Sequence, residues 1–241
     1  FKLVEAMGID EEMIRRTLRS RINADVHKGL AKDIVALRPE VLRRLKEAGL
    51  DGAVHHFDPD RFNPAVPLGG NLFYATPSRE ITPQSLATDM RMIRMLDEIG
   101  LTPGGLEIAQ AVVDTLRHTF GRDGTDHPLF RRLGIEDETY LRLVDIAAKR
   151  ARLGDDGLTP EEQGLMLGVP FLLTAEQIGP SFPERYKDEI LDIRRTQSEK
   201  LRQIAGEKFT PITPETYIQR LTVTENAIFG RVSMMAGAKA E

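Results

Sequence analysis

Three Thr-Pro pairs and three glycines punctuate the middle of this chain. The pairs are Thr82-Pro83, Thr102-Pro103 and Thr159-Pro160. A Thr hydroxyl can accept a hydrogen bond from a free N–H at the start of a helix, and Pro is tolerated at the first helical position because its missing N–H would have no partner there. Each pair therefore predicts the start of a helix. The glycines fall where such helices would end, at Gly100, Gly121 and Gly154.

The residues between these signals have the apolar spacing of helices. Apolar positions recur every three or four residues, most clearly from 86 to 99 and from 106 to 120. Thr159 and Glu162 also fit a capping box. The pattern predicts helices near 83–99, 103–120, 135–153, 160–168 and 183–205. We therefore expect a mainly α fold, a helical bundle with at most a few short strands, near 53–57 and 209–212.

The first fifty residues favour helices as well. Asp10 is suited to cap a first helix, and apolar residues from Ile22 to Leu37 continue at helical spacing. Pro39 is suited to the start of a further helix, because Pro is tolerated in a first turn. Gly49 is a natural stop for that helix.

Two segments on either side of the central helices resemble each other. Residues 222–230 (TVTENAIFG) correspond to residues 67–75 (PLGGNLFYA), which places Asn226 opposite Asn71. The stretch 209–211 (FTP) likewise echoes 57–59 (FDP). These similarities divide the chain into an N-terminal helical segment (1–50), a first repeat motif with a turn-rich linker (51–81), a helical insert (82–205), and a second repeat motif with a C-terminal tail (206–241).

Composition excludes several classes of protein. The chain has 241 residues, a formal net charge of −4 and no cysteine. The negative charge argues against a nucleic-acid partner, since such proteins carry basic surfaces. The absence of cysteine excludes disulfides, thiol catalysis and cysteine-ligated metals. No apolar run reaches the length of roughly 18 residues that a spanning helix needs, so we expect no direct membrane insertion.

The common catalytic and phosphate-binding motifs are missing too. The glycine pairs Gly69-Gly70 and Gly104-Gly105 belong to neither a dinucleotide fingerprint nor a P-loop. No HExxH or GxSxG occurs, and Asp155-Asp156-Gly157 lacks the alternating oxygen ligands of a calcium loop. The histidines are His27, His55, His56, His118 and His127, and no two of them have the i, i+4 spacing that places two ligands on one face of a helix. We therefore expect no catalytic, cofactor-binding or metal-binding residue in this chain.

The stretch 222–230 nevertheless resembles a known protein family. TVTENAIFG is similar to the T-V-x-E-N-I-x-F-G stretch of ABC transporter ATPases, which follows the Q-loop and opens the helical subdomain. The whole pattern resembles a group of long bacterial ABC transporter ATP-binding proteins in which a helical insert, flanked by two such motifs, interrupts the nucleotide-binding domain. The resemblance covers roughly 50–235 and is also carried by 57–64, 96–101, 127–130 and 209–211.

This resemblance implies that the chain is a fragment, the helical inserted region of an ATPase subunit. The parent protein would couple ATP hydrolysis, with magnesium, to transport across a membrane. Its partners would be the remainder of the nucleotide-binding domain and the transporter's membrane domain, and it would lie in the cytoplasm at the inner face of the membrane. Asn71 and Asn226 would lie near the contact with the membrane domain.

The chain departs from the family in the residues that perform catalysis. Walker A, Walker B and the LSGGQ signature are absent, and no Gln stands where the Q-loop would precede the motif. ATP hydrolysis needs phosphate-binding amides, a Lys and magnesium ligands in one site. The resemblance therefore carries no catalytic residue over to this chain, which would be non-catalytic alone.

Two other interpretations remain open. The chain fits a free-standing helical protein-interaction or scaffold domain, in which TVTENAIFG is simply a capped helix start. An enzyme whose carboxylates and histidines come together from separate helices has no support from spacing, and it would require a pocket that brings such groups together.

Overall fold

The computed structural model describes residues 9–121 and 124–239 and divides the chain into two compact units. Unit 1 is formed by both ends of the chain, up to Ala65 and again from Thr210. Unit 2 is the continuous segment Val66–Phe209. Helices dominate the described residues, and the strands form two sheets of two strands each, so the expected mainly α fold is confirmed.

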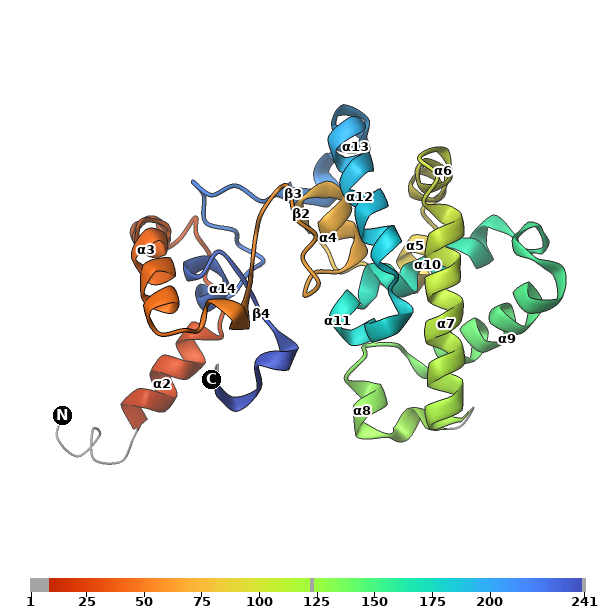
Figure 1. Cartoon of the computed structure of the whole chain (residues 1–241), viewed down its shortest axis with the longest axis horizontal. Coiled ribbons are helices and arrows are strands. Elements are labelled where there is room, and N and C mark those ends of the chain that lie inside the picture. Colours follow the sequence, from red (N-terminus) through yellow and green to blue (C-terminus); the bar gives the residue numbers. More distant parts are fainter. Residues whose placement is uncertain (1–8, 122–123, 240–241) are drawn as a thin grey trace. The chain divides into compact units, whose positions relative to one another are not determined.

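Unit 1 combines two N-terminal helices with a C-terminal helix and a small sheet (Figure 1). Its elements are α2 (Ile9–Leu18), α3 (Lys28–Glu47), a 3₁₀ turn (Asp51–Ala53), β1 (Val54–His56), α14 (Val223–Ala227), β4 (Gly230–Val232) and a final 3₁₀ segment (Met234–Lys239). β1 pairs antiparallel with β4, with Val54 opposite Val232 and His56 opposite Gly230. Strand β3 (Phe209–Pro211) lies at the boundary between the units.

α3 and α14 form the centre of unit 1 by packing against each other. The helical predictions for 1–50 need two corrections here. Residues 21–27 form turns, because the Asn23 side chain accepts the N–H groups of Asp25 and Val26 and so replaces helical bonds. Pro39 lies inside α3 and does not start a helix. Tertiary contacts of α3 override the local signal of Pro39, since the preceding Arg38 is buried and bonded to the other segment of the unit.

Unit 2 is a helical bundle built around α10 (Figure 1). Its elements are α4 (Leu68–Phe73), β2 (Ala75–Pro77), α5 (Pro83–Ala87), α6 (Met90–Glu98), α7 (Thr102–Phe120), α8 (Pro128–Arg131), α9 (Asp137–Leu153), α10 (Pro160–Leu172), α11 (Ala175–Ile178), α12 (Glu184–Thr196) and α13 (Ser198–Ala205), with 3₁₀ turns at Gly124–Asp126, Asp155–Gly157, Gly179–Ser181 and Gly206–Lys208. α10 packs against α5 and α7 and is buried on all sides from Gly164 to Phe171. A helix that is apolar all round belongs in a core.

Local capping signals placed several helices of unit 2 correctly. The Thr82 and Thr159 hydroxyls each accept an N–H three residues on, and both capping boxes are complete, with Ser85 and Glu162. Gly100, Gly121 and Gly154 have positive φ at the expected stops. Thr102 is an exception. Leu101 is the N-cap of α7, and the buried Thr102 hydroxyl has no hydrogen-bond partner among the described residues.

The structure differs from the predicted helix boundaries in three places. The helix expected over 83–99 is two, because the Asp89 side chain accepts the N–H of Met92 and starts α6. The helix expected over 183–205 is also two, interrupted at Gln197. α10 continues to Leu172, and its residues from Gly164 to Phe171 are all buried in the bundle.

The glycine pair Gly104-Gly105 serves close helix packing. A Cβ atom on Gly104 would lie 2.3 Å from Cε2 of Tyr186, and one on Gly105 would lie 2.5 Å from Cδ2 of Leu167. The Tyr186 ring is fixed in place, since its hydroxyl donates to the Leu101 carbonyl at 3.0 Å, and burial raises its pKa. Two consecutive glycines therefore let α7 approach its neighbours closely.

Replacing Gly104 tests this packing. We expect Gly104→Ala to lower the free energy of unfolding by about 1–2 kcal/mol, because the overpacking cost exceeds the gain of about 1 kcal/mol in helix propensity. Gly29→Ala is the matched control, because Gly29 is helical and a Cβ atom added to it would meet nothing within 4 Å. Urea unfolding followed by circular dichroism should show the control unchanged or stabilised. An equally stable Gly104→Ala would contradict the close approach.

Candidate functional site

Two residues with unusual backbone conformation mark the repeated motifs. Among the described residues, Tyr74 and Phe229 are the non-glycine residues with positive φ, at 47° and 44°. A left-handed conformation costs a bulky L-residue about 1 kcal/mol, so surrounding contacts must hold it. Tyr74 lies three residues after Asn71, and Phe229 lies three residues after Asn226. The two copies thus share the same strained position.

Both asparagines use their side chains in the same way. Asn71 donates through Nδ2 to the Val66 carbonyl at 2.8 Å, five residues back. Asn226 donates through Nδ2 to the Leu221 carbonyl, also five residues back, at 3.3 Å. Both side chains are buried, with exposed fractions of 2% and 0%. Each amide therefore fixes the loop that leads into its own short helix, α4 or α14.

A buried arginine completes each motif. In unit 2, Cζ of Arg194 lies 5.4 Å from the Tyr74 ring centroid, and its Nη1 donates to the Asn71 carbonyl at 2.9 Å. In unit 1, Cζ of Arg38 lies 4.5 Å from the Phe229 ring centroid, and its Nε donates to the Asn226 carbonyl at 2.8 Å. We call each set of arginine, asparagine and left-handed aromatic a clamp.

Arg38 binds further carbonyl groups in its clamp. Arg38 also donates to the carbonyls of Pro214 and Thr216, the second at 3.0 Å. Burial lowers the pKa of Arg38, while the charge of Glu215 raises it. Carbonyl oxygens and the ring face replace the water that a buried guanidinium loses. The clamp is thus a satisfied structural site and leaves no polar group of Arg38 for a reaction.

The asparagines and the left-handed aromatics of the two copies stand 155 positions apart, and further elements correspond at the same offset, whereas the two arginines stand 156 positions apart. β1 corresponds to β3 and β2 to β4, and the 3₁₀ turns that precede β1 and β3 also correspond. The Ser233 N–H donates to the Ala53 carbonyl at 2.9 Å, and the equivalent Ser78 N–H donates to the Lys208 carbonyl at 2.7 Å. The chain therefore contains a structural duplication.

The pairing of strands exchanges partners between the copies. β1 of the first copy pairs with β4 of the second, and β2 pairs with the start of β3, where the chain leaves unit 2. In each clamp the arginine comes from a helix outside the repeated segments, α3 for Arg38 and α12 for Arg194. Arg38 and Asn226 are 188 residues apart in sequence, and Arg194 and Asn71 are 123 apart.

The alignment of 209–211 with 57–59 needs correction. At the constant offset, Asp58-Pro59 corresponds to Thr213-Pro214, and the turns agree. The Arg61 N–H donates to the Asp58 carbonyl at 3.3 Å, and the Thr216 N–H donates to the Thr213 carbonyl at 3.5 Å. The Phe-x-Pro match was misleading, because residues 209–211 form strand β3, whereas residues 57–59 follow strand β1.

The described histidines and aspartates make separate local contacts and do not gather in one group. Over residues 9–121 and 124–239, no group of His, Asp or Glu side chains is arranged to hold a metal ion. His56 contacts Asp51 at 3.1 Å, and His127 caps α8 by accepting the Leu129 N–H at 3.2 Å. Asp155 pairs with Arg150 at 2.6 Å. These contacts are structural ones.

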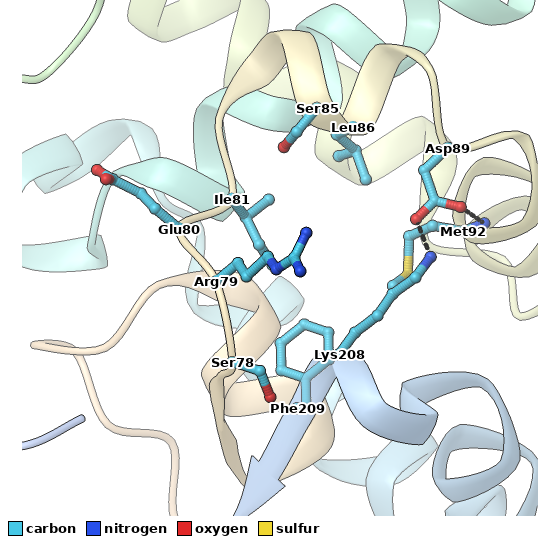
Figure 2. Close-up of a pocket in the computed structure, with 10 residues that line it drawn as sticks. All are labelled: Ser78, Arg79, Glu80, Ile81, Ser85, Leu86, Asp89, Met92, Lys208 and Phe209. Carbon is cyan, nitrogen blue, oxygen red and sulfur yellow. Dashed lines mark hydrogen bonds and ion pairs between the residues drawn. The ribbon is translucent and has the colours of Figure 1, made fainter. Parts of the chain in front are cut away.

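A pocket of about 400 Å³ lies within unit 2, beside α5, α6 and the start of β3. Figure 2 shows side chains from three parts of the sequence around it. They are Ser78, Arg79, Glu80, Ile81, Ser85, Leu86, Asp89, Met92, Lys208 and Phe209. The expectation of no binding residue rested on motifs, and these ten residues form no known motif, so no signal in the sequence indicated this pocket.

The charged side chains of the pocket differ in their bonding and in their direction. Asp89 is occupied on both oxygens: Oδ1 accepts the Met92 N–H at 3.2 Å, and Oδ2 pairs with Lys208. Arg79 points into the pocket, whereas Glu80 points away (Figure 2). Asp89 and Lys208 are 119 positions apart in the sequence, and no local motif predicts that they pair.

Comparison with known proteins adds no assignment. Neither a protein-family model, nor a curated protein, nor a solved structure matches the chain. Within the described part of the chain, no helix has the length and apolar character needed to cross a membrane. The interpretation therefore depends on the geometry of the clamps, the duplication and the pocket.

Proposed function

We propose that the chain is the helical inserted region of an ABC transporter ATPase subunit whose parent couples ATP hydrolysis to transport across a membrane. The duplication carries this proposal. The family resemblance includes two copies of one motif, and both copies have the same strained aromatic, the same asparagine contact and the same stacked arginine. A chance match of nine residues would give no reason for this shared conformation.

The division into units supports an insertion. Unit 2 interrupts unit 1 in the sequence, since unit 1 is made of both ends of the chain. The two ends of an insert must return to the same place on its host domain. Near the start and the end of unit 2, Ser78 and Lys208 are joined by a backbone hydrogen bond of 2.7 Å. The insert in this proposal is therefore 66–209, longer than the helical insert expected over 82–205.

The surface of unit 1 supports a protein partner. Six large apolar side chains of its N-terminal part are exposed, at Met13, Ile14, Leu18, Val26, Leu30 and Leu37. A contiguous exposed apolar patch often marks a contact surface, and these side chains all come from one stretch of the sequence. In this proposal the remainder of the nucleotide-binding domain covers them. Asn71 and Asn226 are themselves buried, so any contact near them with a membrane domain involves their neighbours.

The gene that encodes the chain gives the most direct test. The proposal requires a Walker A motif upstream in the same reading frame, and a signature motif with Walker B downstream. A reading frame that contains neither would refute it. That result would favour the alternative, a free-standing helical interaction domain, which the same exposed side chains of unit 1 also fit.

The isolated chain should not bind or hydrolyse ATP. A phosphate site needs several backbone N–H groups at a glycine-rich turn and a Lys nearby. Both glycine pairs are packed inside helices here, where Gly70 faces Val66 and Gly104 faces Tyr186. We expect titration calorimetry with Mg-ATP to give a dissociation constant weaker than about 1 mM. A saturable micromolar isotherm, or phosphate release above a buffer blank, would contradict this.

A further inference from the structure

We propose that the pocket of unit 2 binds a small amphiphilic monoanion, a carboxylate with a short apolar body. Its volume of about 400 Å³ lies within the usual range of small-molecule sites. Three of its lining side chains are buried and apolar, Leu86, Met92 and Phe209, with exposed fractions of 3%, 2% and 5%. Together with Ile81 they offer an apolar wall to a ligand.

The charge of the ligand follows from the charges that line the pocket. Asp89 and Lys208 neutralise each other, and the second oxygen of Asp89 is bonded to the start of α6. Within the described residues, the guanidinium of Arg79 has no hydrogen bond or ion pair, and it points into the pocket (Figure 2). Glu80 also lines the pocket, but its carboxylate points away from it, so the charge presented beside the apolar wall is that of Arg79 (Figure 2). This arrangement favours a ligand with one negative charge.

The shape of the guanidinium favours a carboxylate. Arginine can bind a carboxylate through two parallel N–H···O bonds, which a point charge such as Lys cannot do. The Ser85 hydroxyl is already used in the Thr82 capping box, so it adds little to anion binding. A nucleotide would bring several negative charges to a pocket whose described lining offers one free cation. This inference is independent of the proposed transporter function.

Octanoate is a suitable probe, and 1-octanol is its uncharged counterpart. We expect calorimetry or ¹⁵N chemical shifts to show saturable, one-to-one octanoate binding with a dissociation constant on the order of 0.1–1 mM. The affected amides should lie in 78–92 and 208–209. Octanol should bind at least about tenfold more weakly, because it lacks the charge-assisted hydrogen bonds to Arg79.

Two variants with the same net charge distinguish binding at a specific site from general electrostatic attraction to the protein. Arg79→Gln should weaken octanoate binding about tenfold, the loss expected for one charge-assisted contact. Arg94→Gln removes the same charge from an exposed residue of α6 outside the pocket, and it should bind octanoate as the parent chain does. Both variants remove exposed side chains, and thermal melts should confirm that both remain folded.

Three results would overturn the proposal. They are no saturation by roughly 5 mM octanoate, equal affinity for octanol, or equal losses in the two variants. The first would mean that the pocket is not a site for this class of ligand. The second would show that Arg79 does not select an anion, and the third would show that only net charge matters.

Discussion

Asn226→Ala should lower the free energy of unfolding by about 3–4 kcal/mol, because it leaves several buried backbone groups without partners. The side chain is fully buried. Its Nδ2 donates to the Ile218 carbonyl at 2.9 Å and to the Thr222 carbonyl at 3.0 Å, and its Oδ1 accepts the Ile218 N–H at 2.8 Å. Alanine replaces none of these bonds.

Urea unfolding and hydrogen exchange of Asn226→Ala test this together. The exchange of amides in 212–230 should increase more than that of amides in α10, since the lost bonds all lie in unit 1. Gln219→Ala is the control, because Gln219 is an exposed amide of the same loop, bonded to Asp25 at 3.0 Å. It should cost no more than about 0.5 kcal/mol. A loss below about 1 kcal/mol for Asn226→Ala would contradict the structure of this loop.

Arg38→Ala should lower the free energy of unfolding by about 3 kcal/mol. It removes a ring-stacked cation and leaves the carbonyls of Asn226, Pro214 and Thr216 without their donor. Arg38→Lys should recover less than half of this loss, because one ammonium group cannot reach three carbonyls as a planar guanidinium does. The left-handed Phe229 would also lose the cation over its ring and keep the edge contact with Phe57.

A second arginine of the same helix is the control for Arg38. Arg43 is exposed and pairs with Glu40 and Glu47 on the surface of α3. Arg43→Ala should therefore cost about 0.5 kcal/mol, as exposed pairs usually do. Chemical unfolding of the three variants should rank Arg38→Ala as the least stable, then Arg38→Lys, then Arg43→Ala. Similar stability of the two alanine variants would show that Arg38 does not hold unit 1 together.

The clamps bear on the proposed function through the duplication. Arg38 acts in unit 1 and Arg194 in unit 2, so the asparagine of each copy is held by an arginine from a helix that is distant in sequence. A host domain interrupted by an insert needs stable junctions on both sides. The clamps lie next to those junctions in sequence, close to Ala65 and to Thr210 on the asparagine side. Their stability is therefore a requirement of the insertion that we propose.

The sequence alone determined the features that depend on neighbouring residues. The capping boxes at Thr82 and Thr159 join groups three residues apart, and the glycine stops require only a local positive φ. The mainly α fold and the similarity of 222–230 to 67–75 could be predicted for the same reason. The break between two helices at Asp89 could not be predicted, because the apolar residues keep their helical spacing across it and hide the capping signal.

Only the tertiary structure decided which distant segments meet. The exchanged strand pairing, the arginine–asparagine contacts of the clamps and the Asp89–Lys208 pair of the pocket all join residues more than a hundred positions apart. Such contacts depend on how helices pack, and neither periodicity nor capping encodes a partner for a single arginine. The pocket could not be predicted from the sequence, because its apolar residues and its arginine form no motif and come together only in the fold of unit 2.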